Sequence, residues 1–173
     1  MNYFELFEIP VALNVDKSLV SQKYFELQKK YHPDFFTNAT EEEQYDVLEK
    51  SSIINKAFKT LQDEDATLKY LLELKGILTE EEKYELPPAF LMEIMELNET
   101  LVTEDTTSVT ETEQKIKHVE LELDEGIKSI ISGYKEMETS NEKLIALKAY
   151  YYKKKYLKRI LDRIEGIRNI APL

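Results

Sequence analysis

The sequence contains no cysteine and only two histidines, His32 and His118. The absence of cysteine excludes disulfide bonds, thiol catalysis and thiolate metal sites, and it is compatible with a reducing cytoplasm. Two imidazoles are too few for a histidine-rich metal site. We therefore expect a protein with no bound metal and no cofactor.

Glycine and proline are also scarce, with four and five residues in a chain of 173. The spacing of apolar residues is helical nearly throughout, and no strand-like alternation interrupts it. No apolar run approaches the ~18 residues that can span a bilayer, and no cationic start followed by an apolar stretch marks a signal peptide. We expect an all-α cytoplasmic protein, with one ordinary domain or two small ones and no membrane partner.

Acidic residues outnumber basic ones, and the formal net charge of −11 disfavours nucleic acid as a partner. Residues 143–168 are the exception, because nine Lys and Arg stand there against two acids. Their local net charge is +7 (9 − 2), which leaves −18 (−11 − 7) for the remainder. This basic stretch has three interpretations: a solvated helix face balancing acidic neighbours, a surface for an acidic protein, or a weakly supported RNA contact.

The tripeptide His32-Pro33-Asp34 follows a predicted amphipathic helix over residues 19–31. One face of that helix carries Val20, Tyr24, Leu27 and Tyr31, at steps of four, three and four. Lys23 and Lys30 fall on another face. Proline lacks an N–H and pushes the preceding residue out of the helical region. The histidine and aspartate are therefore expected on a stiff turn beside a positive face, which suits docking to a protein.

Caps and apolar spacing predict the other helices. We expect a helix over about 41–61 behind a Thr40 capping box, and a short helix over 66–74 with Gly76 as its C-cap. A third helix is expected over 89–101, with Pro88 in its first turn. The last two helices are expected to be capped by residues 110–113 and by Ser140, and to end near 137 and 166. Residues 35–39 and 103–110 are expected as loops. One face of the 41–61 helix is expected to carry Leu48, Ser51, Ile54, Asn55, Phe58 and Leu61.

Three blocks in this order and spacing resemble the J-domain, the module that stimulates ATP hydrolysis by DnaK-type heat-shock chaperones. The blocks are residues 1–10 with Tyr3 and Leu6, the tripeptide His32-Pro33-Asp34, and residues 54–61 reading Ile-Asn-Lys-Ala-Phe-Lys-Thr-Leu. The resemblance implies that His32 and Asp34 contact the chaperone's nucleotidase domain and linker, and that Pro33 fixes the turn. It also implies that Lys23, Lys29 and Lys30 steer the domain towards an acidic groove. Alone, the tripeptide is an ordinary surface turn and the lysines are ordinary surface residues.

Two further blocks extend the resemblance to nearly the whole chain. Residues 68–76, Leu-Lys-Tyr-Leu-Leu-Glu-Leu-Lys-Gly, and residues 90–99, Phe-Leu-Met-Glu-Ile-Met-Glu-Leu-Asn-Glu, resemble the HscB family of J-type co-chaperones in iron–sulfur cluster assembly. The implied fold is a J-domain with a helical hairpin over residues 1–76, a linker over 77–88 and a three-helix bundle over 89–173, in an L-shaped arrangement. The implied partners are a DnaK/HscA-type heat-shock chaperone and an IscU-like scaffold protein.

Residues 90–97 hold six apolar residues in eight positions, too many for one buried stripe. Phe90, Ile94 and Leu97 share one face, and Leu91 and Met95 share another, so we expect one core face and one exposed face. The alternative is that both faces of this helix are buried in the core. The resemblance assigns scaffold binding to Leu91, Met92, Met95, Glu96 and Glu99, with an aromatic companion, Tyr151 or Tyr152. The register of Tyr150–Tyr152 stays open, and Asn98 stands where the family often has arginine.

Other function classes explain less of the sequence. The dense carboxylates at residues 41–43 and 80–82 are expected in the first turns of helices, where they favour the helix dipole. No phosphate-binding loop and no nucleophile–base pair is present, so we expect an activator of a partner ATPase and not an enzyme. A general J-protein for folding clients is the alternative, although it would usually carry a Gly/Phe-rich linker or a cysteine-rich module.

Overall fold

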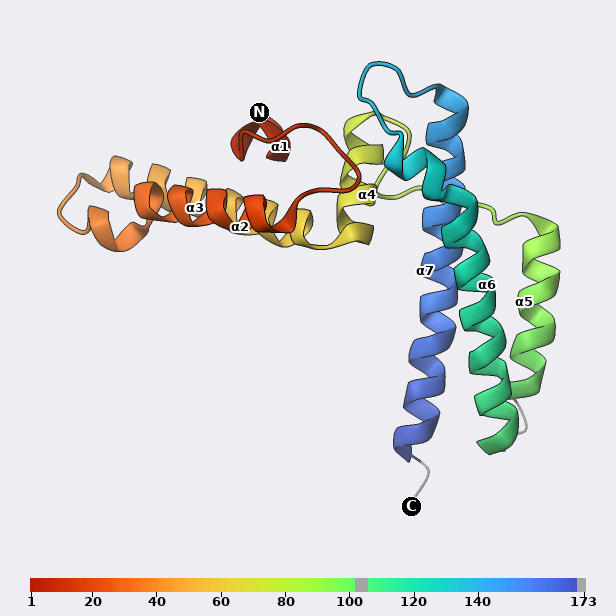
Figure 1. Cartoon of the computed structure of the whole chain (residues 1–173). Helices are drawn as coiled ribbons and strands as arrows, with labels where there is room; N and C mark the ends of the chain where they lie inside the picture. Colours follow the sequence, from red (N-terminus) through yellow and green to blue (C-terminus); the bar gives the residue numbers. More distant parts are fainter. Residues whose placement is uncertain (102–105, 171–173) are drawn as a thin grey trace. The chain divides into compact units, whose positions relative to one another are not determined.

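A computed structural model gives the fold of residues 1–101 and 106–170 (Figure 1). The regular elements are α1 (Tyr3–Leu6), α2 (Lys17–Tyr31), the 3-10 helix η1 (Pro33–Phe36), α3 (Glu41–Gln62), α4 (Glu64–Leu74), α5 (Pro88–Thr100), α6 (Thr106–Ser132) and α7 (Asn141–Ile170). The predicted all-α class is confirmed, since these two ranges contain no strand. Within the same ranges, no helix combines the length and apolarity that crossing a bilayer demands.

The described residues divide into two compact units. The first unit consists of Met1–Gly76 together with Tyr134–Thr139, and the second holds the other described residues. Within the first unit, Lys75 Nζ lies 3.1 Å from a carboxylate oxygen of Glu136. The assignment of residues 1–76, 77–88 and 89–173 to a J-domain, a linker and a scaffold-binding bundle stays a prediction, as does the L-shaped arrangement.

The first unit is built on the antiparallel hairpin of α2 and α3, which run side by side in Figure 1. Asp16 caps α2 by accepting hydrogen bonds from the backbone N–H groups of Ser18 and Leu19. Between the helices, the rings of Tyr24 and Phe58 stack with centroids 4.1 Å apart. The core beneath the hairpin contains Phe4, Phe7, Val20, Ile54, Leu61, Leu68, Leu71 and Leu72.

Two expectations for the first unit need correction. On the predicted face of α3, Ser51, Ile54 and Leu61 are buried, but Leu48 and Asn55 are exposed. Leu48 is 59% exposed, whereas its neighbour Val47 is only 6% exposed. Val47, Ile54 and Leu61 repeat every seven residues, which places them on one helix face. The segment after the tripeptide is also not all loop, because Phe35 and Phe36 complete η1. The Thr40 capping box is confirmed, since Glu43 and Thr40 exchange side-chain to backbone hydrogen bonds.

In the second unit, α5, α6 and α7 form a three-helix bundle (Figure 1). Its core gathers Phe90, Ile94, Leu97, Leu101, Val109, Ile116, Val119, Leu157, Ile160 and Ile164. Pro88 occupies the first turn of α5 as predicted. Ser140 precedes α7 and accepts a long 3.4 Å hydrogen bond from the backbone N–H of Lys143, in line with its predicted capping role.

The helix boundaries of the second unit differ from the predicted ones. Helix α6 begins at Thr106, so residues 106–110 are helical, and residues 103–105 of the expected loop lie outside the described residues. Burial of Val109 and Thr112 offsets the modest helix propensity of the threonines around them. Helix α6 ends at Ser132 and α7 continues to Ile170, whereas we expected ends near 137 and 166.

The second acidic run also departs from prediction. Residues 80–82 lie in a turn, with the Glu82 N–H bonded to the Thr79 carbonyl at 3.2 Å, and not in the first turn of a helix. The capping and dipole explanation therefore applies to residues 41–43 alone. Glu82 instead pairs with Lys148 of α7.

Candidate protein-binding surfaces

The His32-Pro33-Asp34 turn lies at the end of α2. His32 has extended backbone angles, φ −74° and ψ 128°, as expected for a residue before proline. Its ring nitrogen Nδ1 accepts a hydrogen bond from the Asp34 N–H at 3.3 Å, so it caps η1. The ring also meets Phe35 edge to face, with centroids 5.8 Å apart. The half-exposed imidazole is therefore held in one place, and the Asp34 carboxylate beside it is exposed.

The three lysines near this turn have different surroundings. Lys23 Nζ lies 2.7 Å from Glu8 and 3.6 Å from Glu26, and its side chain is largely covered. Its hydrogen bond to Glu8 lowers the pKa of that carboxyl. Lys29 and Lys30 are exposed in the last turn of α2, where cations favour the helix dipole. The positive face next to the turn therefore consists chiefly of Lys29 and Lys30.

A lysine of α3, Lys50, also lies near the end of α2. Lys30 Nζ lies 5.1 Å from the centre of the Tyr31 ring, and Lys50 Nζ of α3 lies 5.5 Å from the same centre. Lys50 thus adds positive charge close to the turn, although it is 16 residues further along the chain than Asp34 (50 − 34). Its contribution depends on the pairing of α2 with α3, so the local sequence around the tripeptide could not indicate it.

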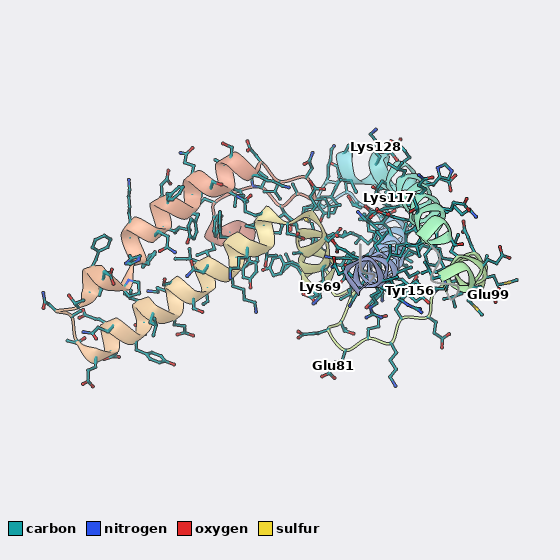
Figure 2. The ribbon with its side chains drawn as sticks, turned by 90° about the horizontal axis from the view of Figure 1, so that it is seen from below. Lys69, Glu81, Glu99, Lys117, Lys128 and Tyr156 are labelled. Atoms are coloured by element: carbon teal, nitrogen blue, oxygen red, sulfur yellow. The ribbon has the colours of Figure 1, made fainter. Side chains whose placement is uncertain are left out.

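On α5, the predicted division into a core face and an exposed face is confirmed. Phe90, Ile94 and Leu97 are buried, while Met92 is 65% exposed and Met95 is 59% exposed. Glu96 and Glu99 are exposed with them, and Leu91 is half-buried at the edge of this surface. We call Leu91, Met92, Met95, Glu96 and Glu99 the α5 ridge. Figure 2 shows the labelled Glu99 on α5 and Tyr156 on α7.

The three consecutive tyrosines of α7 have distinct roles. Tyr150 is buried, and its hydroxyl donates a 2.6 Å hydrogen bond to Asp124 of α6. Burial raises the pKa of this phenol strongly. Tyr152 stacks on Tyr84 with ring centroids 4.4 Å apart, and Tyr151 meets Tyr152 edge to face. Tyr150 therefore belongs to the helix interface, and Tyr151 and Tyr152 are the half-exposed candidates for the aromatic companion.

The basic stretch of α7 is partly neutralised inside its own unit. Lys148 pairs with Glu82 and also donates to the Ile77 carbonyl at 2.8 Å. Lys154 lies 3.5 Å from Asp124 and 3.9 Å from Glu120. These contacts match the interpretation that part of the stretch balances acidic neighbours in the bundle.

The described residues contain no cluster of three or more potential metal ligands from His, Cys, Asp and Glu. His118 on α6 lies 3.4 Å from Glu122 and is well exposed, which is an ordinary surface pair of one helix. The turn after α2 and the α5 ridge stay the predicted protein-binding surfaces.

Comparison with known proteins identifies one family for this chain. The sequence model of the HSCB C-terminal oligomerisation domain matches residues 86–165. The co-chaperone protein HscB homologue of Psychromonas ingrahamii is 36% identical over 148 residues, 84% of each chain. That of Vibrio cholerae (strain M66-2) is 44% identical over 102 residues, which cover 58% of this chain and 60% of the relative.

Solved structures agree with the sequence comparison over the whole fold. The chaperone HscB from Vibrio cholerae matches with a TM-score of 0.75 and 28% identity, and the alignment covers 98% of both chains. The human co-chaperone protein HscB matches with a TM-score of 0.79 and 29% identity, over 98% of this chain and 83% of the human one. The chain therefore belongs to the HscB family of co-chaperones.

Proposed function

We propose that this protein is a two-site adaptor in iron–sulfur cluster assembly. Its first unit stimulates ATP hydrolysis by a DnaK/HscA-type heat-shock chaperone, and its second unit binds and delivers an IscU-like scaffold protein. The observation that carries the proposal is the exposure of Met92 and Met95 on a helix whose opposite face is buried. A monomeric bundle gains nothing from two exposed methionines, whereas an adaptable docking surface does.

For the chaperone, the contact residues are His32, Pro33 and Asp34, supported by Lys29 and Lys30. The cap from the Asp34 N–H to His32 and the ring contact with Phe35 order the turn before binding, which lowers the entropic cost of association. Lys23 acts mainly by tying α2 to Glu8, which lies in the segment between α1 and α2. Lys29 and Lys30 raise the association rate with an acidic surface.

For the scaffold protein, the contact surface is the α5 ridge together with Tyr151. The two methionines and Leu91 supply apolar area, and the exposed Glu96 and Glu99 supply negative charge towards its C-terminal end. Such an apolar patch with a charged edge is the usual composition of a transient interface. A scaffold segment with an apolar centre and basic residues facing Glu96 and Glu99 fits it.

The protein itself is proposed to catalyse no reaction. Hydrolysis takes place on the chaperone, and the adaptor changes its rate by a coupling free energy between bound proteins. His32 accordingly acts as a contact and not as a general base. The proposed location is the cytoplasm, and neither nucleic acid nor membrane is a proposed partner.

Calorimetric titration of the full chain with the organism's IscU-like protein tests the scaffold half of this proposal. Met92→Ala with Met95→Ala is expected to abolish measurable binding, because both exposed anchors of the ridge are removed. Leu121→Ala with Ile145→Ala is the matched control, since these two apolar residues are equally exposed on other faces of the second unit. Equal loss in both double variants, or binding that survives without the methionines, contradicts the proposal.

A further inference from the structure

A groove runs beside the α5 ridge, between α5, α7 and the segment that precedes α5. Its volume is about 690 Å³, and it lies entirely within the second unit. The apolar and aromatic part of its lining consists of Tyr84, Leu86, Pro88, Leu91, Tyr152 and Tyr156. Because Leu91 belongs both to the ridge and to this lining, the groove is continuous with the proposed scaffold-binding surface.

The α7 wall of the groove is cationic. Lys155 and Arg159 both line it, and they are four residues apart on the helix, so their side chains leave the same face one turn apart. Neither makes an ion pair with any residue in the described parts of the chain. Lys155 Nζ instead lies 5.8 Å from the centre of the Tyr151 ring.

The charges on the opposite wall do not cancel this cationic pair. Glu82 is occupied by Lys148, which lies outside the groove. The remaining charged lining residues are Lys83, Glu85, Lys155 and Arg159, a net charge of +2 (3 − 1). In a chain with a net charge of −11, this is a local positive site next to an apolar surface.

We propose that this groove takes an apolar side chain of the scaffold protein together with a neighbouring aspartate or glutamate. The inference rests on the proposed scaffold function and adds the chemistry of one half of the docked segment. The apolar side chain packs against Leu91 and the stacked Tyr84–Tyr152 pair, and the carboxylate meets Arg159 and Lys155. Guanidinium and carboxylate form strong paired hydrogen bonds, which favours an acidic over a neutral partner group.

This arrangement also fixes the direction of docking. Glu96 and Glu99 place negative charge along the ridge, while Lys155 and Arg159 place positive charge on the α7 side. A scaffold segment with an acid at one end and basic residues at the other fits when its acid meets Lys155 and Arg159 and its basic residues meet the glutamates. The reverse orientation brings like charges together and is therefore disfavoured.

The test is calorimetric titration of the full chain with the IscU-like protein at low and high salt. Arg159→Glu is expected to weaken binding by about tenfold at low salt, because it removes a charge-assisted contact and repels the carboxylate. Lys158→Glu is the matched control: it is the adjacent residue, exposed on the same helix, with the same change of charge, and it does not line the groove. Its effect is expected to stay within about twofold. Thermal unfolding of each variant separates loss of contact from loss of fold.

The outcomes separate this inference from the proposed function. If the methionine double variant loses binding while Arg159→Glu matches Lys158→Glu, the groove inference is wrong and the scaffold function stands. Tighter binding by Arg159→Glu shows that a basic segment occupies the groove, which also overturns the inference. A change in self-association of the Arg159→Glu variant on a sizing column also overturns the inference, because a second copy of this chain then occupies the groove. If the unaltered chain does not bind the scaffold, both proposals fall.

A reciprocal exchange gives positive evidence for the carboxylate. A scaffold variant in which the contacting acid is replaced by lysine binds the unaltered chain poorly, and Arg159→Glu restores part of that binding. Restoration with Arg159→Glu but not with Lys158→Glu supports the direct contact through a coupling that only neighbouring groups show. If Arg159→Glu restores binding to none of the acid-to-lysine scaffold variants, the direct contact between Arg159 and a scaffold carboxylate is contradicted.

Discussion

The imidazole of His32 is fixed by the backbone of Asp34, through the 3.3 Å hydrogen bond from the Asp34 N–H to Nδ1. Since Nδ1 accepts this bond, the neutral ring carries its proton on Nε2. The turn therefore presents an N–H donor and the exposed Asp34 carboxylate to the proposed chaperone partner, from two residues that hold each other in place. The two side-chain groups are separated by 3.7 Å between Nδ1 and the nearer carboxylate oxygen.

Replacing His32 by asparagine is expected to separate the structural role of this ring from its contact role. Asparagine is a favoured N-cap, so it can still accept the hydrogen bond from the Asp34 N–H. We expect thermal stability within about 1 kcal/mol of the original, as for other exposed substitutions, but loss of chaperone ATPase stimulation. Stimulation that persists with asparagine shows that the imidazole makes no required contact.

Charge reversal at Lys30 is expected to weaken chaperone stimulation without unfolding the protein. Lys30 is exposed beside the turn, and its effect on association should fade as salt screens it. Lys59→Glu is the control, because Lys59 is an exposed lysine in the last turn of α3. Stimulation measured across a salt series checks this, and equal loss from both reversals argues against a steering role for the α2 lysines.

Glu43 is expected to make the first unit sensitive to acid. The hydrogen bond from the Thr40 backbone N–H lowers the pKa of Glu43 from its ordinary value of 4.5. A carboxyl whose folded pKa is depressed stabilises the fold above its unfolded pKa, and that contribution is lost as pH falls through the folded pKa. Glu43→Gln should therefore melt earlier than the original at neutral pH, and the two melting curves should converge in acid. A constant difference at every pH contradicts this linkage.

Lys148 is expected to hold the segment before α5 in place. It pairs with Glu82 and donates to the Ile77 carbonyl. The second carboxylate oxygen of Glu82 is buried and has no hydrogen-bond partner among the described residues. Lys148→Met leaves that carboxylate unpaired, which should cost about 1–3 kcal/mol in urea unfolding. Adding Glu82→Gln to Lys148→Met should recover part of the loss. If the second change destabilises further, the pair is not the source of the effect.

Local patterns predicted most of the fold because caps and apolar spacing are local properties. Thr40 and Pro88 begin helices as predicted, and the tripeptide ends α2 where proline requires it. The predicted face of α3 was right at Ser51, Ile54 and Leu61 but wrong at Leu48, because Val47 and Leu48 are adjacent and both apolar, so only packing distinguishes them. The start of α6 was missed because threonines favour loops unless burial compensates, as it does at Thr112.

Contacts between distant segments could not be predicted from the sequence. Nothing near Lys23 indicates that Glu8 binds it, and nothing near Leu91 indicates a groove formed with Arg159. The order of roles within Tyr150–Tyr152 likewise depends on Asp124 and Tyr84, which lie on other segments. The two faces of α5 were predictable, since six apolar residues in eight exceed what one buried stripe holds.

The most direct test of the adaptor proposal is steady-state ATP hydrolysis by the organism's DnaK-type chaperones, with and without its IscU-like protein. We expect the original chain to stimulate hydrolysis and the scaffold to increase that stimulation synergistically. Met92→Ala with Met95→Ala should retain the first effect and lose the second, while His32→Gln should lose both. If the scaffold adds nothing to stimulation by the original chain, the iron–sulfur role is wrong and a general J-protein fits better. If no chaperone is stimulated at all, the adaptor account is contradicted.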